Sequence, residues 1–207
     1  GSRDLRELGG IGRSSPLLAA VAALACLSMA GLPPTVGYLG KEAAFEAFVE
    51  PGPGHVWVLA GVVAGSALTV AYTLRFLWGA FADRPGASHG MRRAPAASLA
   101  PTALLAAGGL ALGVAPPAVE ALALGHAASY PVEGEPYHLA LWHGVGPPLL
   151  LSLLTLAAGT VLHLARGPLS AAHGRTPRAL DAQTAQDRLA RATAATARAV
   201  TAHTQVG

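Results

Sequence analysis

Long stretches of this chain carry almost no charged side chains, and this arrangement restricts its fold more than any other feature. Residues 16–32 read PLLAAVAALACLSMAGL, and similar apolar runs cover about 55–82, 98–115 and 138–165. Only 12% of the 207 residues are charged, against about 25% in an average soluble domain, and the charges gather between the runs. Because a membrane-spanning helix needs about 20 apolar residues, the pattern predicts an all-α, polytopic transmembrane bundle.

The first apolar run is interrupted at its centre. Pro33 and Pro34 remove backbone donors and cannot continue a helix, after which the chain resumes at Gly37 as GYLGKEAAFEAFV. The segment 16–49 can therefore form two short crossings or one long broken crossing. Four spans are expected in the second case, over 16–49, 55–82, 98–115 and 138–165.

The distribution of arginine decides between these two topologies. Arginines occupy residues 1–15, 83–97 and 166–178, whereas the connections at 50–54 and 120–137 contain neither Arg nor Lys. Only a single broken crossing over 16–49 places every basic segment on one side, which the positive-inside rule makes cytoplasmic. We therefore expect a multi-pass protein of the cell membrane with residues 1–15, 83–97 and 166–207 in the cytoplasm.

The polar tail after the fourth span has two interpretations. Residues 1–15 are expected to form a cytoplasmic loop and residues 16–166 the membrane domain, which leaves 167–207 as a cytoplasmic-side linker. Arg188, Arg191 and Arg198 fall on one face of a helix there, opposite a weak apolar stripe. This pattern fits an amphipathic helix at the membrane surface, although a solvated basic linker remains the alternative.

Lysine occurs once among the fourteen basic residues, at position 41, and the other thirteen are arginine. Arginine stays protonated in proteins, whereas a lysine can lose its proton when it is buried. A group that gains and loses a proton inside a membrane can therefore be Lys but not Arg. We expect Lys41 to translocate protons, because an ionisable side chain at membrane depth is by default a candidate functional group.

The helix break at Pro33, Pro34 and Gly37 strengthens this expectation. Irregular backbone at membrane depth normally lines a cavity, and broken helices of this kind form ion sites in transporters. Glu42 is a secondary candidate for the proton path, since an acidic neighbour stabilises a protonated lysine, and Glu46 follows one turn later. The alternative is that Lys41 reaches an interface or pairs with Glu42 or Glu46 for structure alone.

Other candidate residues give weaker signals. Arg75 lies within the second span and can extend its side chain to the cytoplasmic surface, while several histidines near span ends can relay protons (His55, His126, His138 and His143). Their spacing matches no metal site, no cofactor motif or catalytic triad is present, and the net charge of +3 gives no support for nucleic-acid binding. We therefore expect a transporter subunit without cofactors rather than an enzyme.

Several segments resemble the antiporter-like subunits shared by respiratory complex I and the multisubunit Mrp cation/proton antiporters. SMAGLPPTVGYLGKE at 28–42 is similar to the second discontinuous helix of that family, and AYTLRFLWGAF at 71–81 is similar to the helix that follows it. The resemblance implies that Lys41 is the lysine of the proton path. Glu42, where the complex I subunit tends to have Asp, and LWHGVGPPLLLSLLTLAAG at 141–159 resemble the large A subunit of the Mrp type.

This resemblance implies exchange of Na⁺ or another monovalent cation for protons within a hetero-oligomeric membrane complex. The chain opens at Gly1 without Met and stops within a helical pattern, so we expect an internal segment. The resemblance implies that this segment lacks the family's first discontinuous helix with its own lysine, and we therefore expect that it does not transport by itself. Two alternatives remain, namely the proton-translocating membrane subunit of an NADH-quinone oxidoreductase and a structural membrane protein with a paired lysine. The chain does not indicate which cation moves, nor whether Glu46, Arg75 or a histidine participates.

Overall fold

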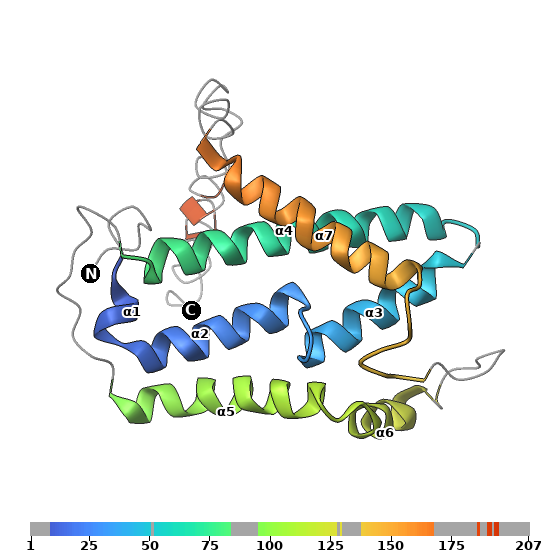
Figure 1. The fold of residues 1–207 in the computed structure, drawn as a ribbon, viewed down its shortest axis with the longest axis horizontal. Coiled ribbons are helices and arrows are strands. Elements are labelled where there is room, and N and C mark those ends of the chain that lie inside the picture. The colour runs from blue at the N-terminus through green and yellow to red at the C-terminus, as the bar shows by residue number, and fades with distance from the viewer. Residues whose placement is uncertain are drawn as a thin grey trace, which may run out of the picture. The chain divides into compact units, whose positions relative to one another are not determined.

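The computed structural model describes residues 9–50, 52–83, 95–127, 129, 138–167, 186, 190–191 and 193–194. Over these residues the chain is all-helical, which confirms the predicted fold class (Figure 1). The helices are α1 (Ile11–Ser14), α2 (Pro16–Ala30), α3 (Val36–Val49), α4 (His55–Phe81), α5 (Ala96–Gly113), α6 (Pro116–Ala127) and α7 (Pro147–Leu164). All seven belong to one compact unit, residues 1–164, and the amphipathic helix expected within 167–207 falls largely outside the described residues.

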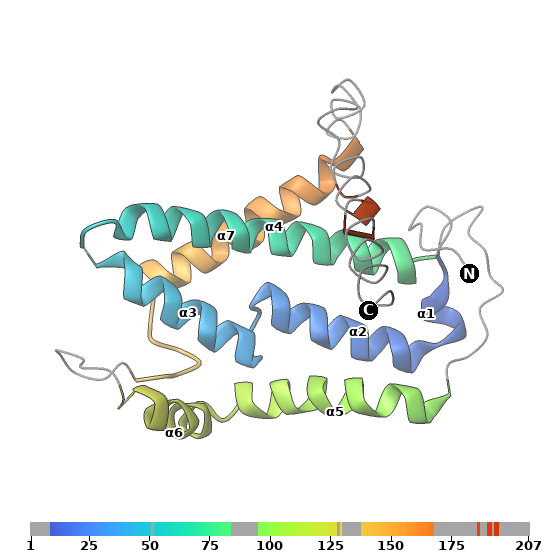
Figure 2. The ribbon, with the colours of Figure 1, turned by 180° about the vertical axis from the view of Figure 1, so that it is seen from behind.

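Helices α2 and α3 are the two halves of the interrupted segment. They contain 15 and 14 residues, so at 1.5 Å per residue each is only about 21–23 Å long and shorter than a hydrocarbon core of about 30 Å. Both views show α3 continuing in the general direction of α2 beyond a short break (Figures 1 and 2). Together, but not separately, the two halves are long enough for one crossing.

A backbone hydrogen bond fixes which helix ends lie together. The amide of Gly10, just before α1, donates to the carbonyl oxygen of Ala82, just after α4, over 2.9 Å. An exposed ion pair between Arg13 and Asp83, 3.0 Å long, lies at the same place. The start of α2 and the end of α4 therefore share one end of the bundle, as a single broken crossing requires and two separate crossings would not allow.

Two helices, α4 and α7, are each long and apolar enough to span a membrane within the described part of the chain. Helices α5 and α6 form a third candidate segment if the pair is counted together, although the chain bends by 95° between them. The expected third span, 98–115, matches α5. Helix α6 follows and extends into the expected connection, because Pro116 occupies its first turn, where the missing N–H is not needed.

The expected start of the fourth span at residue 138 is wrong. Helix α7 begins at Pro147, and residues 138–146 are irregular. Gly144 has a φ of 87°, which favours glycine and interrupts a helix, and Pro147 suits a first helical position. The boundary was misplaced because residues 138–146 are apolar although they are not helical. His143 from this irregular segment lines a cavity beside α3.

Helix α7 packs mainly on α4 and also on α3, while α2 packs on α4 and α5. A Cβ at Gly159 of α7 would lie 2.5 Å from the Ala67 carbonyl oxygen of α4, so the two backbones touch at this glycine. Large apolar side chains such as Trp57, Leu105 and Leu122 are exposed, whereas polar Thr35 and Thr155 are fully buried. Apolar side chains outside and hydroxyls inside suit a bundle that lies in lipid.

Candidate functional site

The break between α2 and α3 is a defined turn of five residues, 31–35. Gly31 takes a left-handed conformation with φ 67° and ψ 50°, and the amides of Gly31 and Leu32 donate back to the carbonyls of Ser28 and Leu27. This is the Schellman arrangement that commonly closes a helix at glycine. It satisfies two carbonyls of the last turn and leaves the carbonyl of Ala30 available to another donor.

Lys41 supplies that donor from the second turn of α3. Its ammonium Nζ donates to the Ala30 carbonyl oxygen over 3.2 Å, and its side chain passes over Gly31. A Cβ on Gly31 would lie 2.8 Å from Lys41 Cε and 3.0 Å from Nζ. Because the end of a helix carries a partial negative charge, the half-buried ammonium lies where the broken helix attracts a cation.

Lys41 forms no ion pair within the part of the chain that the structure describes. Among the described residues no salt bridge joins it to Glu42 or Glu46, although the charge of Glu42 is close enough to act on it. The two side chains, adjacent in sequence, point to different helices, with Lys41 directed to α2 and Glu42 to α7. Within the described residues, Lys41 is therefore not paired with a carboxylate on its own helix, as the simple structural alternative would require.

Glu42 is buried, with 5% of its surface exposed. Its carboxylate oxygen Oε1 accepts a hydrogen bond of 2.6 Å from the hydroxyl of Ser152 on α7, which is 2% exposed. A distance of 2.6 Å is at the short end of the range for a hydrogen bond between two oxygen atoms. The backbone carbonyl of Ser152 in turn accepts from the Thr155 hydroxyl over 2.8 Å, so the contact belongs to a buried polar network.

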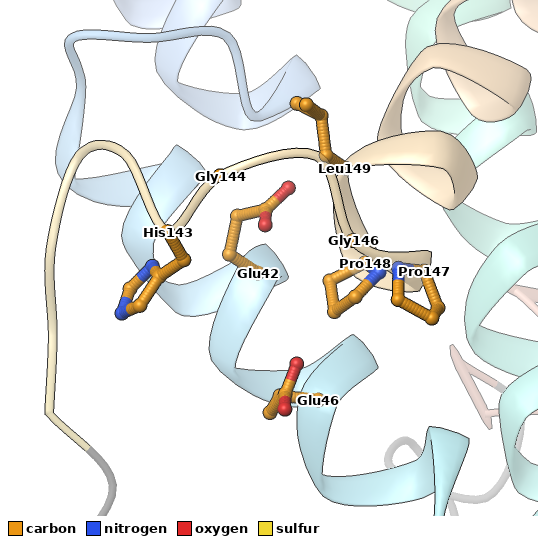
Figure 3. Close-up of a pocket in the computed structure, with 8 residues that line it drawn as sticks. All are labelled: Glu42, Glu46, His143, Gly144, Gly146, Pro147, Pro148 and Leu149. Carbon is orange, nitrogen blue, oxygen red and sulfur yellow. The ribbon is translucent and has the colours of Figure 1, made fainter.

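A cavity of about 270 Å³ lies beside this contact. Figure 3 shows the carboxylates of Glu42 and Glu46 and the imidazole of His143 around it, with the start of α7 on the other side. Glu42 and Glu46 are four residues apart on α3 and thus share a face. His143 comes from the irregular segment before α7, and its Nε2–H donates to the His138 carbonyl over 2.7 Å.

Glycines allow the elements around the break to approach closely. Gly37 was expected to form part of the break, but it lies in the first turn of α3, where a Cβ would overlap the Ser28 carbonyl of α2. On α5, a Cβ at Gly113 would overlap the backbone of Pro34 and Thr35. Gly113 is buried against the turn, so α5 supports the break from the side.

The remaining candidates lie away from Lys41. Arg75 has an exposed side chain on α4, the His55 Nδ1–H donates to the Glu50 carbonyl over 2.9 Å, and His138 pairs with Glu120 of α6 over 3.2 Å. Over the described part of the chain no cluster of His, Cys, Asp and Glu is arranged to hold a metal ion. Of the histidines expected near span ends, only His143 lines the cavity beside Glu42.

Comparison with known proteins places this arrangement in a family. Residues 1–69 match the model for the transmembrane region of NADH:quinone oxidoreductase/Mrp antiporter proteins. The chain also superposes on a solved Mrp complex from Dietzia sp. DQ12-45-1b with a TM-score of 0.65 and 32% identity, over 96% of this chain and 22% of that one. The chain belongs to the NADH:quinone oxidoreductase/Mrp antiporter family.

Curated members of this family lie on both of its branches. The chain is 34% identical over 176 residues to the A/B subunit of a probable K⁺/H⁺ antiporter from Rhizobium meliloti, which covers 79% of this chain and 17% of that protein. It is 43% identical over 105 residues to the N subunit of an NADH-quinone oxidoreductase from Acidothermus cellulolyticus, covering 51% of this chain and 18% of that protein. The chain thus spans less than a fifth of the length of either relative.

Proposed function

We propose that this chain is a segment of the membrane subunit of a monovalent cation/proton antiporter and that Lys41 carries the proton. The observation that supports this role is the hydrogen bond of 3.2 Å between Lys41 Nζ and the Ala30 carbonyl oxygen. A charge at a helix end is stabilised by roughly 0.3–1 kcal/mol, and by up to about 2 kcal/mol when partly buried. Removing one partner of a buried ion pair costs more, about 3–5 kcal/mol, so the contact with Ala30 holds Lys41 in place without locking it in its charged form.

In this mechanism the broken helix provides two states for one side chain. The ammonium of Lys41 lies at the negative end of α2, and its flexible four-carbon stem also lets it swing towards the Glu42 carboxylate. The neutral amine loses most of its attraction to both positions. Such movement couples the protonation state of Lys41 to its position along the crossing, which is the minimum requirement of a proton carrier.

Membership of a larger complex follows from the same relatives. The matches to the Mrp complex and to the K⁺/H⁺ antiporter support assembly with other membrane subunits and transport of Na⁺, K⁺ or another monovalent cation. We place the protein in the cell membrane, with residues 1–15, 83–97 and 166–207 on the cytoplasmic side. Because the chain covers less than a quarter of these proteins, other segments supply the remaining steps of the pathway.

The second candidate is the membrane subunit of an NADH-quinone oxidoreductase, supported by 43% identity to the N subunit over 105 residues. The antiporter is favoured, because the match to the K⁺/H⁺ antiporter extends over 79% of the chain rather than 51%. A match of this extent includes part of the sequence beyond the second apolar run.

A transport assay on the complete complex separates the two functions. In inverted membrane vesicles that have been acidified inside, an antiporter dissipates the pH gradient when Na⁺ or K⁺ is added, with no electron donor. A quinone oxidoreductase instead supports acidification that depends on NADH and quinone, and added cations have no effect. Cation-dependent dissipation that disappears when the gene is deleted supports the antiporter, whereas its absence together with NADH-driven acidification contradicts it.

A further inference from the structure

The hydroxyl of Ser152 contacts Glu42 across two helices that are 110 residues apart in sequence, through a buried bond of 2.6 Å. Both partners are more than nine-tenths buried, at 5% and 2% exposure. Glu42 follows Lys41 directly, while its carboxylate borders a cavity that Lys41 does not line. The position of this carboxylate therefore depends on α7 as well as on its own helix.

The cavity contains groups suited to protons rather than to a bound metal cation. Its titratable members are Glu42, Glu46 and His143 (Figure 3). Imidazole is a poor ligand for Na⁺ and K⁺, but it exchanges protons near neutral pH. His143 donates its Nε2–H to the His138 carbonyl, because a carbonyl can only accept.

The position of the cavity indicates which side of the membrane it faces. Its lining residues come from α3 and from the start of α7. Figure 1 shows the start of α7 at the opposite end of the bundle from α1 and the end of α4, where Gly10 and Ala82 are hydrogen-bonded. Arg13 and Asp83 lie at the same end as this hydrogen bond, which is the expected cytoplasmic side, so the cavity is on the expected outer side. The N-terminus of α7, which carries a partial positive charge, also lies at the cavity.

We propose that Ser152 is a positioning residue for a proton route from Lys41 through Glu42 into the cavity of Glu46 and His143. This inference rests on the proposed role of Lys41. The Lys41 side chain leaves Ala30 and its ammonium gives a proton to the Glu42 carboxylate, which yields a neutral amine and a carboxylic acid. The acid then gives the proton to His143, Glu46 or water in the cavity, and Glu42 returns to its ionised form beside Ser152.

A double-mutant cycle in the complete complex tests the role of Ser152. Ser152→Ala should lower cation/proton exchange by about fivefold or more, because a hydrogen bond to a charged group is lost, while Ser152→Thr, which keeps a hydroxyl, should retain most activity. Ser152→Ala combined with Glu42→Gln should be no slower than Glu42→Gln alone, because both changes act on one carboxylate. Thr160→Ala removes an exposed hydroxyl from the same helix and should leave exchange unchanged.

A labelling experiment tests the cavity independently of activity. In a background without other reactive cysteines, Leu149→Cys should react with a charged, membrane-impermeant thiol reagent from the outer side, because Leu149 lines the cavity. Leu153→Cys, on an exposed apolar face of the same helix, should not react. This result does not depend on whether Ser152→Ala assembles.

Several outcomes would overturn the inference. The route would be excluded if either Ser152→Ala or Glu42→Gln exchanged at the wild-type rate. Additive losses in the double mutant, or a Leu149→Cys protein that is not labelled, would also exclude it. If Lys41→Arg also exchanges normally, the proposed function fails as well. If Lys41→Arg is inactive while Ser152→Ala is normal, only the route through Ser152 and Glu42 is wrong.

Discussion

The ammonium of Lys41 lies 3.2 Å from the carbonyl oxygen of Ala30, eleven residues earlier and on the other side of a helix break. This relationship joins the two halves of the broken crossing through one titratable side chain. It exists because Gly31 ends α2 without a side chain of its own, so the stem of Lys41 can lie against the turn. The lysine and the break are thus one structural feature, and changes to either should affect transport.

Gly31→Ala should displace Lys41. The new methyl group would lie 2.8 Å from Lys41 Cε, and the flexible lysine stem moves more readily than the backbone. The left-handed φ of 67° adds a cost of roughly 1–2 kcal/mol for alanine. We expect transport to fall by roughly tenfold or more, because small displacements of a reacting group have large effects on rate, while the complex still assembles.

Gly40→Ala is the matched control for this substitution. Gly40 lies on the same helix as Lys41, and a Cβ there meets no atom within 4 Å. Replacing a helical glycine by alanine is favourable by roughly 0.5–1 kcal/mol, so transport should remain normal and the thermal stability of the complex should not fall. Normal transport by Gly31→Ala would show that the contact between Lys41 and the turn is not needed.

Gly113→Ala should disturb the break from the side of α5. A Cβ at this position overlaps the backbone of Pro34 and Thr35, and backbone atoms cannot yield as a side chain can. Overpacking of this kind typically costs about 1–3 kcal/mol, so we expect a lower melting temperature of the purified complex together with reduced transport. Gly108→Ala on the same helix, where a Cβ meets nothing within 4 Å, should change neither measurement.

The broken crossing also makes a prediction about membrane sides. Single cysteines placed at Arg13 and Asp83 should both be protected from an impermeant maleimide in intact cells and react in inverted vesicles. A cysteine at Glu50 should show the opposite pattern, because α2 and α3 together cross once. If Arg13→Cys and Glu50→Cys react from the same side, residues 16–49 form two crossings or a re-entrant hairpin, and the topology is wrong.

The sequence was sufficient for much of the fold. The second span was predicted at 55–82 and α4 covers His55–Phe81, because an uninterrupted apolar run bounded by glycine and proline has few alternatives in lipid. Lys41 was also singled out from the sequence, as the single lysine near a proline break, and its role remains a proposal. The predicted start of the fourth span was wrong, because residues 138–146 are apolar but not helical. Gly144 and Pro147 were the signals in the sequence that indicated an irregular segment there.

The partners of the site could not be found in the same way. Ser152 is a hydroxyl in an apolar run, and nothing local distinguishes it from Thr160 on the exposed face of α7. Its contact with Glu42 depends on how α3 and α7 pack, which in turn depends on close contacts such as that between Gly159 and Ala67. Side-chain pairs of this kind are products of the tertiary fold and have no periodic signature in sequence.

Transport by Lys41→Arg in the complete complex, measured as cation-dependent dissipation of a pH gradient in inverted vesicles, tests the role of Lys41 most directly. Arg75→Lys, which exchanges the same two residue types at an exposed position on α4, is the control and should be nearly normal. Because arginine keeps its proton, Lys41→Arg should show no exchange above the level of vesicles that lack the complex, although the complex assembles. Exchange at the wild-type rate by Lys41→Arg would contradict the claim that Lys41 carries the proton.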